Sequence, residues 1–474
     1  MLLYRWLRWV AGVALRWYYR RIDVVGLERV PADAPLLIAA NHPNQLVDAM
    51  LVAYALQRPV TFTGKAVLLD NPVARVMLRH LPFVPLRRAG DERKASPAPA
   101  TAGPGNAPDP ARNADAFRAI VDAHAAGGAV LVFPEGISHH GPQLAPMKTG
   151  IARIALQARD DRGVRGLCIL PVGLTFEQKE EPRTRVLVEV GEPLAMDGWQ
   201  STDAPVDGLT RDVDERLRAI TLNFPTVDAA ERVLRVSRLL AELSRDARPL
   251  DEEVRDAPYT PVVDVTRRVD AVRRSIERPG TVDASRVDRF QARLDAFERS
   301  LAEHDVMPAD VGIAVGVRPG ARFLLREGAI ALAAGPLALW GRLNHWIPLR
   351  LARLVAARSS RAPEDPAMHT LVVGLAAVVL FYALQTTLVG MVAGPLPALA
   401  YLLTLVPSAD WDFRLRDRHR RALARVRTYL RFRRDPALRA RLLEEMAWLR
   451  GEAAEIERMA VERGQARREA MSEK

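Results

Sequence analysis

Short apolar runs alternate with longer amphipathic stretches through residues 22–204. The runs have the length of buried strands, and the stretches have the spacing of helices. The strand candidates are residues 35–40, 59–63, 82–86, 128–132 and 167–173, and the helix candidates are residues 45–57, 71–80, 112–126 and 147–159. Such alternation is typical of an α/β domain, so we expect a mixed, largely parallel sheet flanked by helices.

The rest of the chain shows helical spacing with changing polarity. Residues 205–310 interleave Arg and Asp, which predicts a helical region without catalytic residues. Residues 411–474 are mostly charged, with apolar residues recurring at helical spacing, which predicts a charged helical tail. Residues 325–408 are strongly apolar and are expected to be membrane-associated.

Residues 370–406 carry no charge and form the most apolar segment. Because one crossing needs about 20 residues, the segment is long enough for a two-pass hairpin with Gly394-Pro395 at its turn. Arginines flank both ends, which by the positive-inside tendency places both ends in the cytoplasm. A buried helical pair in a soluble core is the alternative. The apolar patch at 328–340 is expected to be too short to cross and to lie at the membrane interface.

Residues 1–21 mix Trp, Tyr and Arg with aliphatic residues but lack a long uncharged core. This pattern argues against a signal peptide or a full membrane span. Arginine recurs among the aromatic positions, so an interfacial amphipathic helix is expected. A helix packed on the following domain is the alternative.

Composition limits the possible partners. The chain has 474 residues, too many for one average domain, and 68 Lys and Arg against 57 Asp and Glu give a net charge of +11. It has no zinc-ligand spacing, recognition-helix signature or basic aromatic stripe, so anionic lipid fits this charge better than nucleic acid. Its one cysteine, Cys168, falls in a predicted core strand and excludes an intrachain disulfide or a thiolate metal cluster.

One segment interrupts the α/β pattern. Residues 92–110 are rich in Pro, Ala and Gly and have little to bury, so a disordered surface loop is expected there. A lid over a site is the alternative to an inert insertion.

A candidate general base follows the first predicted core strand, where His42 and Asp48 lie six positions apart. A carboxylate bonded to one imidazole nitrogen leaves the other free to accept a proton from a hydroxyl group. Pro43 disfavours a helical conformation at His42, so a helix is expected to begin at Gln45 with Asn44 as its cap. Asp48 in an early helical turn is then able to contact the histidine. The other nearby histidines, at 80, 124 and 140, are assigned to solvated surfaces.

Four further strand ends carry polar or turn-forming residues. Lys65 follows the strand at 59–63, and Arg87 and Arg88 follow the strand at 82–86, where their charges suit a phosphate group. The strand at 128–132 leads into Phe-Pro-Glu-Gly-Ile-Ser-His, residues 133–139, and the strand at 167–173 ends in Pro-Val-Gly.

In this order and spacing, the four segments resemble the glycerolipid acyltransferase family over residues 20–200. Its members carry a His/Asp block, an arginine block, a Phe-Pro-Glu-Gly block and a Pro-Val block. Five residues separate His42 from Asp48, where the commonest pattern has four. The His-Pro-Asn-Gln wording, with Ser138, His139 and Lys148, is most similar to the fungal-type branch that acylates glycerol 3-phosphate. The domain is accordingly expected to occupy residues 22–204.

The resemblance implies that His42, oriented by Asp48, activates an acceptor hydroxyl for attack on the thioester of acyl-CoA or acyl carrier protein. It implies no metal and no other cofactor. It nominates as substrate-binding residues Lys65, Arg87, Arg88, Glu135, Gly136, Ser138, His139 and Lys148. Glu135 is expected to hold a cation or a backbone turn, and Gly136 to allow close approach of the ligand. The resemblance implies glycerol 3-phosphate as the acceptor, with lysophosphatidate as the alternative, and an inactive membrane scaffold is the alternative from outside the enzymes.

Overall fold

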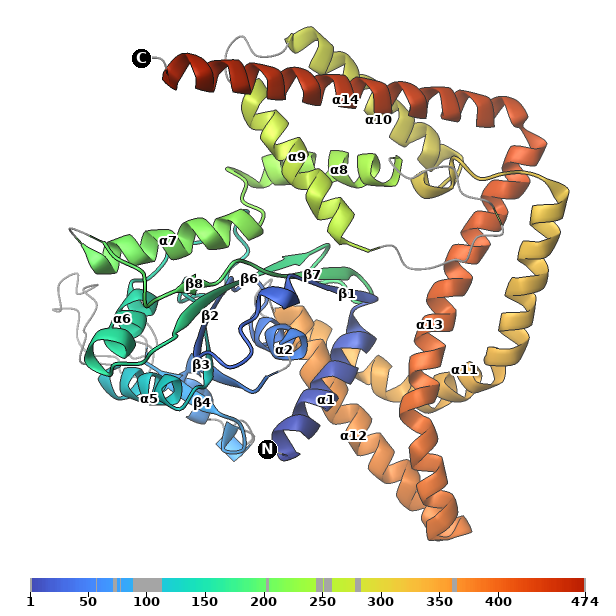
Figure 1. Ribbon diagram of the computed structural model, residues 1–474. Helices are drawn as coiled ribbons and strands as arrows, with labels where there is room; N and C mark the ends of the chain where they lie inside the picture. The colour runs from blue at the N-terminus through green and yellow to red at the C-terminus, as the bar shows by residue number, and fades with distance from the viewer. Residues whose placement is uncertain are drawn as a thin grey trace. The chain divides into compact units, whose positions relative to one another are not determined.

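The computed structural model describes residues 2–56, 58–70, 75–76, 78–87, 113–201, 204–243, 250, 258–277, 283–359 and 365–472. The chain forms two compact units (Figure 1). The first comprises Met1–Pro225 with Arg353–Leu375, and the second comprises Thr226–Ala352 with Ala376–Lys474. The expected loop at 92–110 lies outside the described residues, as does half of the helix expected at 71–80.

The first unit is built on an eight-stranded sheet. Its strands are β1 (Arg21–Val25), β2 (Leu36–Ala40), β3 (Val60–Lys65), β4 (Phe83–Leu86), β5 (Ala129–Val132), β6 (Cys168–Phe176), β7 (Arg185–Val190) and β8 (Leu194–Ala195). The order is β1-β7-β6-β2-β5-β3-β4, with β8 paired to β6. Only the β6–β7 and β6–β8 pairings are antiparallel, so the predicted mixed, largely parallel sheet is confirmed.

Helices cover both faces of this sheet (Figure 1). Because successive strand residues point to opposite faces, Leu36 and Ile38 pack with α1 (Leu2–Tyr18) and α2 (Leu46–Ala55), and Leu37 packs on the other side. The second face is covered by α5 (Ala114–Ala125), α6 (Gly150–Leu156) and α7 (Pro205–Ile220). α6 is followed by a π-helical turn, Gln157–Asp161. Helices thus form within three of the four predicted stretches, and in the fourth, 71–80, the described residues 75, 76 and 78 are helical. Cys168 begins a core strand as predicted but is only half-buried.

His124, on α5, contradicts its assignment to a solvated surface. Its side chain is fully buried, and Nε2 lies 3.2 Å from the carbonyl oxygen of Leu36. The helical spacing of Ile120, Val121 and His124 places all three on the sheet-facing side of α5. His80 is exposed, and His140 is half-buried beside Glu180.

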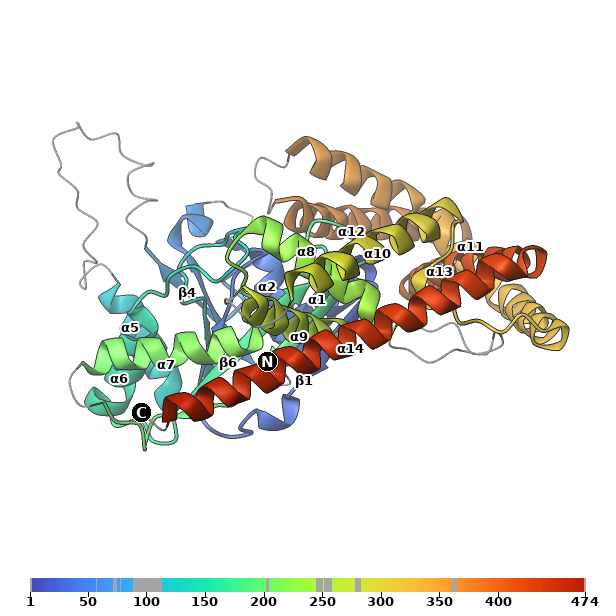
Figure 2. The same ribbon diagram turned by 90° about the horizontal axis from the view of Figure 1, so that it is seen from above.

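The second unit is helical. Its helices are α8 (Val227–Leu243), α9 (Thr260–Ile276), α10 (Ala284–Glu303), α11 (Val317–Ser359), α12 (Asp365–Ala393), α13 (Pro395–Arg434) and α14 (Pro436–Ser472), of which α11 and α12 extend into the first unit. α14 runs beside α9 and α10 in both views (Figures 1 and 2). Phe297, Phe323, Phe432 and Leu449 lie in the shared core. The helical character expected of this half of the chain is thus confirmed.

Two of the described helices are long and apolar enough to cross a membrane, in segments Val317–Val355 and Thr370–Ala393. Both segments are largely unburied within the chain. The prediction that the patch at 328–340 is too short is wrong, because the helix continues past it as far as Ser359. The break expected at Gly394-Pro395 is present: Gly394 has φ 92° and separates α12 from α13.

Candidate active site

The two strands that carry the candidate chemistry are neighbours. β2 and β5 pair in parallel, with Ala39 opposite Val132, so the residues that follow them leave the sheet at the same edge. His42 follows β2, and residues 133–139 follow β5. The sheet therefore brings the two sequence blocks together at the carboxyl ends of its strands, where open α/β sheets bind ligands.

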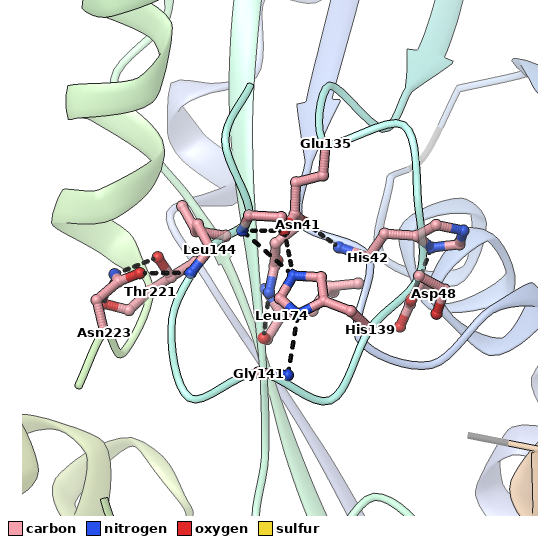
Figure 3. A network of polar contacts seen from close by, with 12 residues as sticks. Asn41, His42, Asp48, Glu135, His139, Gly141, Leu144, Leu174, Thr221 and Asn223 are labelled. Carbon is pink, nitrogen blue, oxygen red and sulfur yellow. Dashed lines mark hydrogen bonds and ion pairs between the residues drawn. The ribbon is translucent and has the colours of Figure 1, made fainter. Parts of the chain in front are cut away.

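The structure brings His42 and Asp48 into contact (Figure 3). His42 Nδ1 lies 2.9 Å from Asp48 Oδ2. α2 begins at Leu46, so Asp48 is its third residue and points back toward the turn. The same oxygen accepts the backbone N–H of Asn44 at 2.7 Å. One carboxylate oxygen thus closes the turn and orients the imidazole.

The prediction that Asn44 caps α2 is wrong. The cap position is Gln45, with φ 50° and no side-chain cap bond. The side chain of Asn44 instead donates to Tyr19 Oη at 3.3 Å and to the carbonyl of Lys179 at 3.2 Å. Asp48 reaches back from the first turn of the helix to the loop, as in the reciprocal half of a capping box.

Burial governs the electrostatics of this pair. Asp48 is 0% exposed, and desolvation raises its pKa above the ordinary value, although the bonds to His42 and Asn44 act in the opposite direction. Its Oδ1 atom is buried without a hydrogen-bond partner. Because a carboxylate only accepts, the proton on His42 lies on Nδ1, and Nε2 keeps its lone pair. The His42 side chain is 13% exposed.

Phe133 contacts one face of the His42 imidazole. Its ring is stacked on His42, with centroids 3.9 Å apart and planes inclined by 13°. The contact fixes the plane of the imidazole, while Asp48 fixes its rotation. Phe133 belongs to the Phe-Pro-Glu-Gly segment, but no pattern in the sequence predicts this role.

The Glu135 carboxylate binds backbone N–H groups of two loop segments. It is 1% exposed, Oε1 accepts the N–H of His42 at 2.8 Å, and Oε2 accepts the N–H of Ala145 at 2.7 Å (Figure 3). His139 Nε2 lies 2.5 Å from Oε2. Of the two tasks expected for Glu135, the structure shows the holding of a backbone turn.

The remaining candidates near this loop are Ser138, Gly136 and Lys148. Ser138 Oγ accepts the N–H of Gln45 at 3.3 Å. Gly136 has φ 72°, and a side chain there would meet the Lys148 stem, since an added Cβ would lie 3.3 Å from Cγ. Lys148 is exposed and its N–H donates to the carbonyl of Pro134. Gly136 thus allows Lys148 to lie close to the loop.

The other cations occupy the same edge further along the sheet. Lys65 ends β3, Arg87 follows β4, both are exposed, and Lys65 is in register with Leu86. At about 4.8 Å per strand, β3 lies roughly 10 Å from β2 and β4 roughly 14 Å from it. Lys65 and Arg87 are therefore placed beside the histidine rather than in contact with it. Arg88 lies outside the described residues.

Two residues that the sequence did not single out tie this edge together. Asn41 Nδ2 donates to the carbonyl of Leu174 at 3.0 Å, and the N–H of Leu174 donates to Asn41 Oδ1 at 2.7 Å. Tyr19 contacts Asn44 through its hydroxyl. Their partners are far away in the chain, so local patterns carry no signal for them. Within the described ranges, no group of three or more His, Cys, Asp or Glu is placed to hold a metal ion.

Comparison with known proteins matches residues 21–175 to the acyltransferase family model. These residues form an acyltransferase-family domain. The chain is 32% identical over 133 residues to glycerol-3-phosphate O-acyltransferase 2 of Saccharomyces cerevisiae, which covers 27% of this chain and 18% of that protein. It is 23% identical over 258 residues to an uncharacterized acyltransferase of Schizosaccharomyces pombe, covering 40% of this chain and 38% of the other. The chain therefore spans less than two fifths of either relative.

Among solved structures, the domain is similar to the 1-acyl-sn-glycerophosphate (LPA) acyltransferase PlsC from Thermotoga maritima. The sequence identity is 21%, the TM-score is 0.34, and the similarity covers 45% of this chain and 78% of that one.

Proposed function

We propose that this acyltransferase-family chain moves a fatty acyl group from a thioester donor to a hydroxyl of glycerol 3-phosphate. The observation that carries the proposal is the His42 imidazole, oriented through Nδ1 by the buried Asp48 and partly exposed at the ligand-binding edge of the sheet. A hydroxyl oxygen is the nucleophile such a base activates, and no covalent enzyme intermediate is needed.

The reaction balances without any other group. His42 Nε2 takes the proton of the acceptor hydroxyl, and the oxygen attacks the thioester carbonyl. The C–O bond forms, the C–S bond breaks, and the departing thiolate takes the proton back from the imidazolium. Asp48 stabilises the imidazolium while it exists, because its carboxylate lies against Nδ1.

Glycerol 3-phosphate is favoured as the acceptor by two considerations. Lys65, Arg87 and Lys148 are exposed cations on the edge that carries His42, and they suit a small phosphorylated polyol beside the base. The Saccharomyces cerevisiae relative bears the name of an acyltransferase for that acceptor. Acyl-CoA is the proposed donor, with acyl carrier protein as the alternative thioester.

The proposed site of action is the cytoplasmic face of a membrane. α12 and α13 form a hairpin around Gly394, with Leu384, Leu388 and Leu396 exposed. Polar contacts join α11 to this hairpin: His345 Nε2, on α11, lies 2.6 Å from Tyr382 Oη on α12, and Trp340 Nε1, also on α11, donates to Thr404 Oγ1 on α13 at 3.0 Å. Exposed apolar faces around hydrogen-bonded polar contacts suit lipid surroundings. We also assign α1 to the interface, since Trp6 and Trp9 are exposed near Arg5 and Arg8.

The test uses the full chain, purified in detergent and returned to anionic vesicles. Acyl-CoA is supplied with glycerol 3-phosphate and lysophosphatidate in competition, and thiol release and both products are measured. We expect release that depends on glycerol 3-phosphate, and a loss of about 10²–10⁴-fold in His42→Ala. His80→Ala removes an exposed histidine elsewhere and is the matched control.

Each other outcome contradicts part of the proposal. Turnover of lysophosphatidate alone would reassign the acceptor to the following step of glycerolipid synthesis. Thiol release with neither acceptor would support hydrolysis, and no release at all would support the membrane scaffold. Loss of vesicle binding together with activity in His42→Ala would indicate misfolding.

A further inference from the structure

We propose that His139 is a positioning residue, which acts through the Glu135 carboxylate to fix the main chain of His42. The inference rests on the proposed acyl transfer and gives His139 a different task from the substrate contact expected from the sequence. It depends on three hydrogen bonds to one buried carboxylate and on a fourth to the ring of His139 (Figure 3).

The ring of His139 has no nitrogen left for a substrate. The N–H of Gly141 donates to Nδ1 at 2.9 Å, so Nδ1 is unprotonated and the proton of the neutral ring lies on Nε2. Nε2 faces Glu135 Oε2 at 2.5 Å and donates to it. With both nitrogens engaged, a phosphate group could bind His139 only by displacing the bond to Glu135.

Glu135 passes this constraint to His42. A carboxylate that is 1% exposed needs donors on both oxygens, because water does not supply them. His139 Nε2 and the N–H of Ala145 donate to Oε2, and the N–H of His42 donates to Oε1. Without His139, Oε2 keeps one donor, and the carboxylate is free to turn away from the peptide that carries the base.

The loop around His139 is itself held at both ends. Ser138 Oγ accepts the N–H of Gln45, so the loop contacts the turn after His42 as well as His42 itself. On the other side, the N–H of Leu144 donates to Asn223 Oδ1 at 2.9 Å, and the N–H of Phe224 donates to the carbonyl of Pro142 at 2.9 Å. The loop is thus a fixed template against which His42 is set.

A residue of this kind affects the chemical step more than substrate affinity. Moving a reacting group by 1 Å can lower the rate by up to about 10²-fold. This effect on the rate is larger than that of losing one hydrogen bond. His139→Leu should therefore lower kcat by about 10–100-fold and leave the KM for glycerol 3-phosphate nearly unchanged.

The conservative variant separates positioning from loss of bulk. In His139→Gln the amide nitrogen replaces Nε2 as the donor to Glu135, and the amide oxygen is available to the N–H of Gly141, so most of kcat should return. His140→Leu changes the adjacent histidine, which lies against Glu180 instead, and should leave kcat unchanged. A raised KM with unchanged kcat in His139→Leu, or failure of Gln to restore kcat, would overturn the proposal in favour of substrate contact.

A second measurement does not need activity. The amides of His42, Asn44 and Gln45 are all hydrogen-bonded to side chains, so deuterium uptake of a peptide covering 41–48 reports on the turn. Uptake should be faster in His139→Leu and like the unaltered protein in His139→Gln. Equal uptake in all variants would exclude the proposal. If the unaltered protein shows no thioester turnover, acyl transfer fails while uptake still decides the role of His139.

Discussion

At the scale of single residues, Asp48 decides how the candidate base is oriented. Its two carboxylate oxygens differ in their hydrogen bonds. Oδ2 accepts from both His42 and Asn44, whereas Oδ1 is buried without a partner. In Asp48→Asn the amide oxygen should remain at the Oδ2 position, because the N–H of Asn44 requires an acceptor there. The imidazole then keeps its tautomer and loses only the negative charge beside it.

We therefore expect Asp48→Asn to lower kcat by about 10²-fold and Asp48→Ala to lower it further, since alanine removes both charge and orientation. KM for both substrates should change little in the Asn variant. Steady-state kinetics of the two variants checks the order. Equal loss in both would mean that orientation contributes nothing beyond charge.

The Asp48 carboxylate favours the proposed catalysis, but its burial lowers the stability of the fold as pH rises. Burial raises the pKa of Asp48 above its ordinary value, so its contribution to stability is fully present below that ordinary value, about 3.9, and is lost as pH rises through the higher folded value. The unaltered protein should thus lose stability relative to Asp48→Asn as pH rises from about 4 toward 7. Thermal unfolding midpoints of both proteins across this range test the sign. A constant difference would mean that Asp48 does not titrate differently in the fold.

Among the helices and strands, α5 carries the clearest pH-sensitive group. Burial lowers the pKa of His124 to about 4, while the bond to the Leu36 carbonyl acts weakly against this. A lowered histidine pKa contributes stability above the ordinary value, about 6.5, that is lost as pH falls toward the folded value.

We expect the unaltered protein to lose about 3 kcal/mol relative to His124→Gln between pH 6.5 and 4. Glutamine keeps a donor for the Leu36 carbonyl and does not titrate. Because the other acids and histidines titrate alike in both proteins, the difference between their unfolding midpoints isolates His124. Parallel acid profiles would show that the ring is hydrated or charged in the folded state.

Local sequence patterns predicted the strands and helices of the first unit well, because apolar runs and turn residues are local properties of the chain. Strands β2 and β5 are continuous apolar runs because helices bury both of their faces, and β2 is followed by Pro43, which stops a helix from starting at His42. Periodicity and turn chemistry are local properties, so they identify the edge at which His42 and Glu135 meet.

The misses have a different origin. The burial of His124, the partners of Asn44 and the engaged ring of His139 depend on contacts with residues brought close by the fold, which spacing along the chain does not encode. The apolar patch at 328–340 alone predicts a shorter helix than α11, because helical spacing continues through the arginines that follow the patch. A histidine or asparagine has several ways to satisfy its polar atoms, and only tertiary structure selects one.

At the scale of the whole molecule, the lengths of the apolar segments constrain the proposed membrane hairpin. The apolar part of α12, Thr370–Ala393, is 24 residues long, or about 36 Å at 1.5 Å per residue, which exceeds a hydrocarbon core of about 30 Å. α13 stays uncharged from Pro395 only to residue 409, so its apolar part measures about 22 Å. In the proposed hairpin α13 would therefore carry Asp412 near one interface, and Asp412 pairs with Arg342 and Arg416.

Cysteine labelling tests the resulting two-pass hairpin. With Cys168 replaced by serine, single cysteines are placed at exposed Met391 and Val461, which are 81% and 51% exposed. In intact cells a membrane-impermeant maleimide should label Met391→Cys, beside the Gly394 turn, and should reach Val461→Cys only after permeabilisation. If both sites need permeabilisation, the hairpin re-enters or α11 and α12 are the crossing pair, because either arrangement returns the Gly394 turn to the side of the arginine-rich part of α13. Labelling of Val461→Cys in intact cells would instead place α14 outside and contradict the positive-inside assignment on which the cytoplasmic site depends.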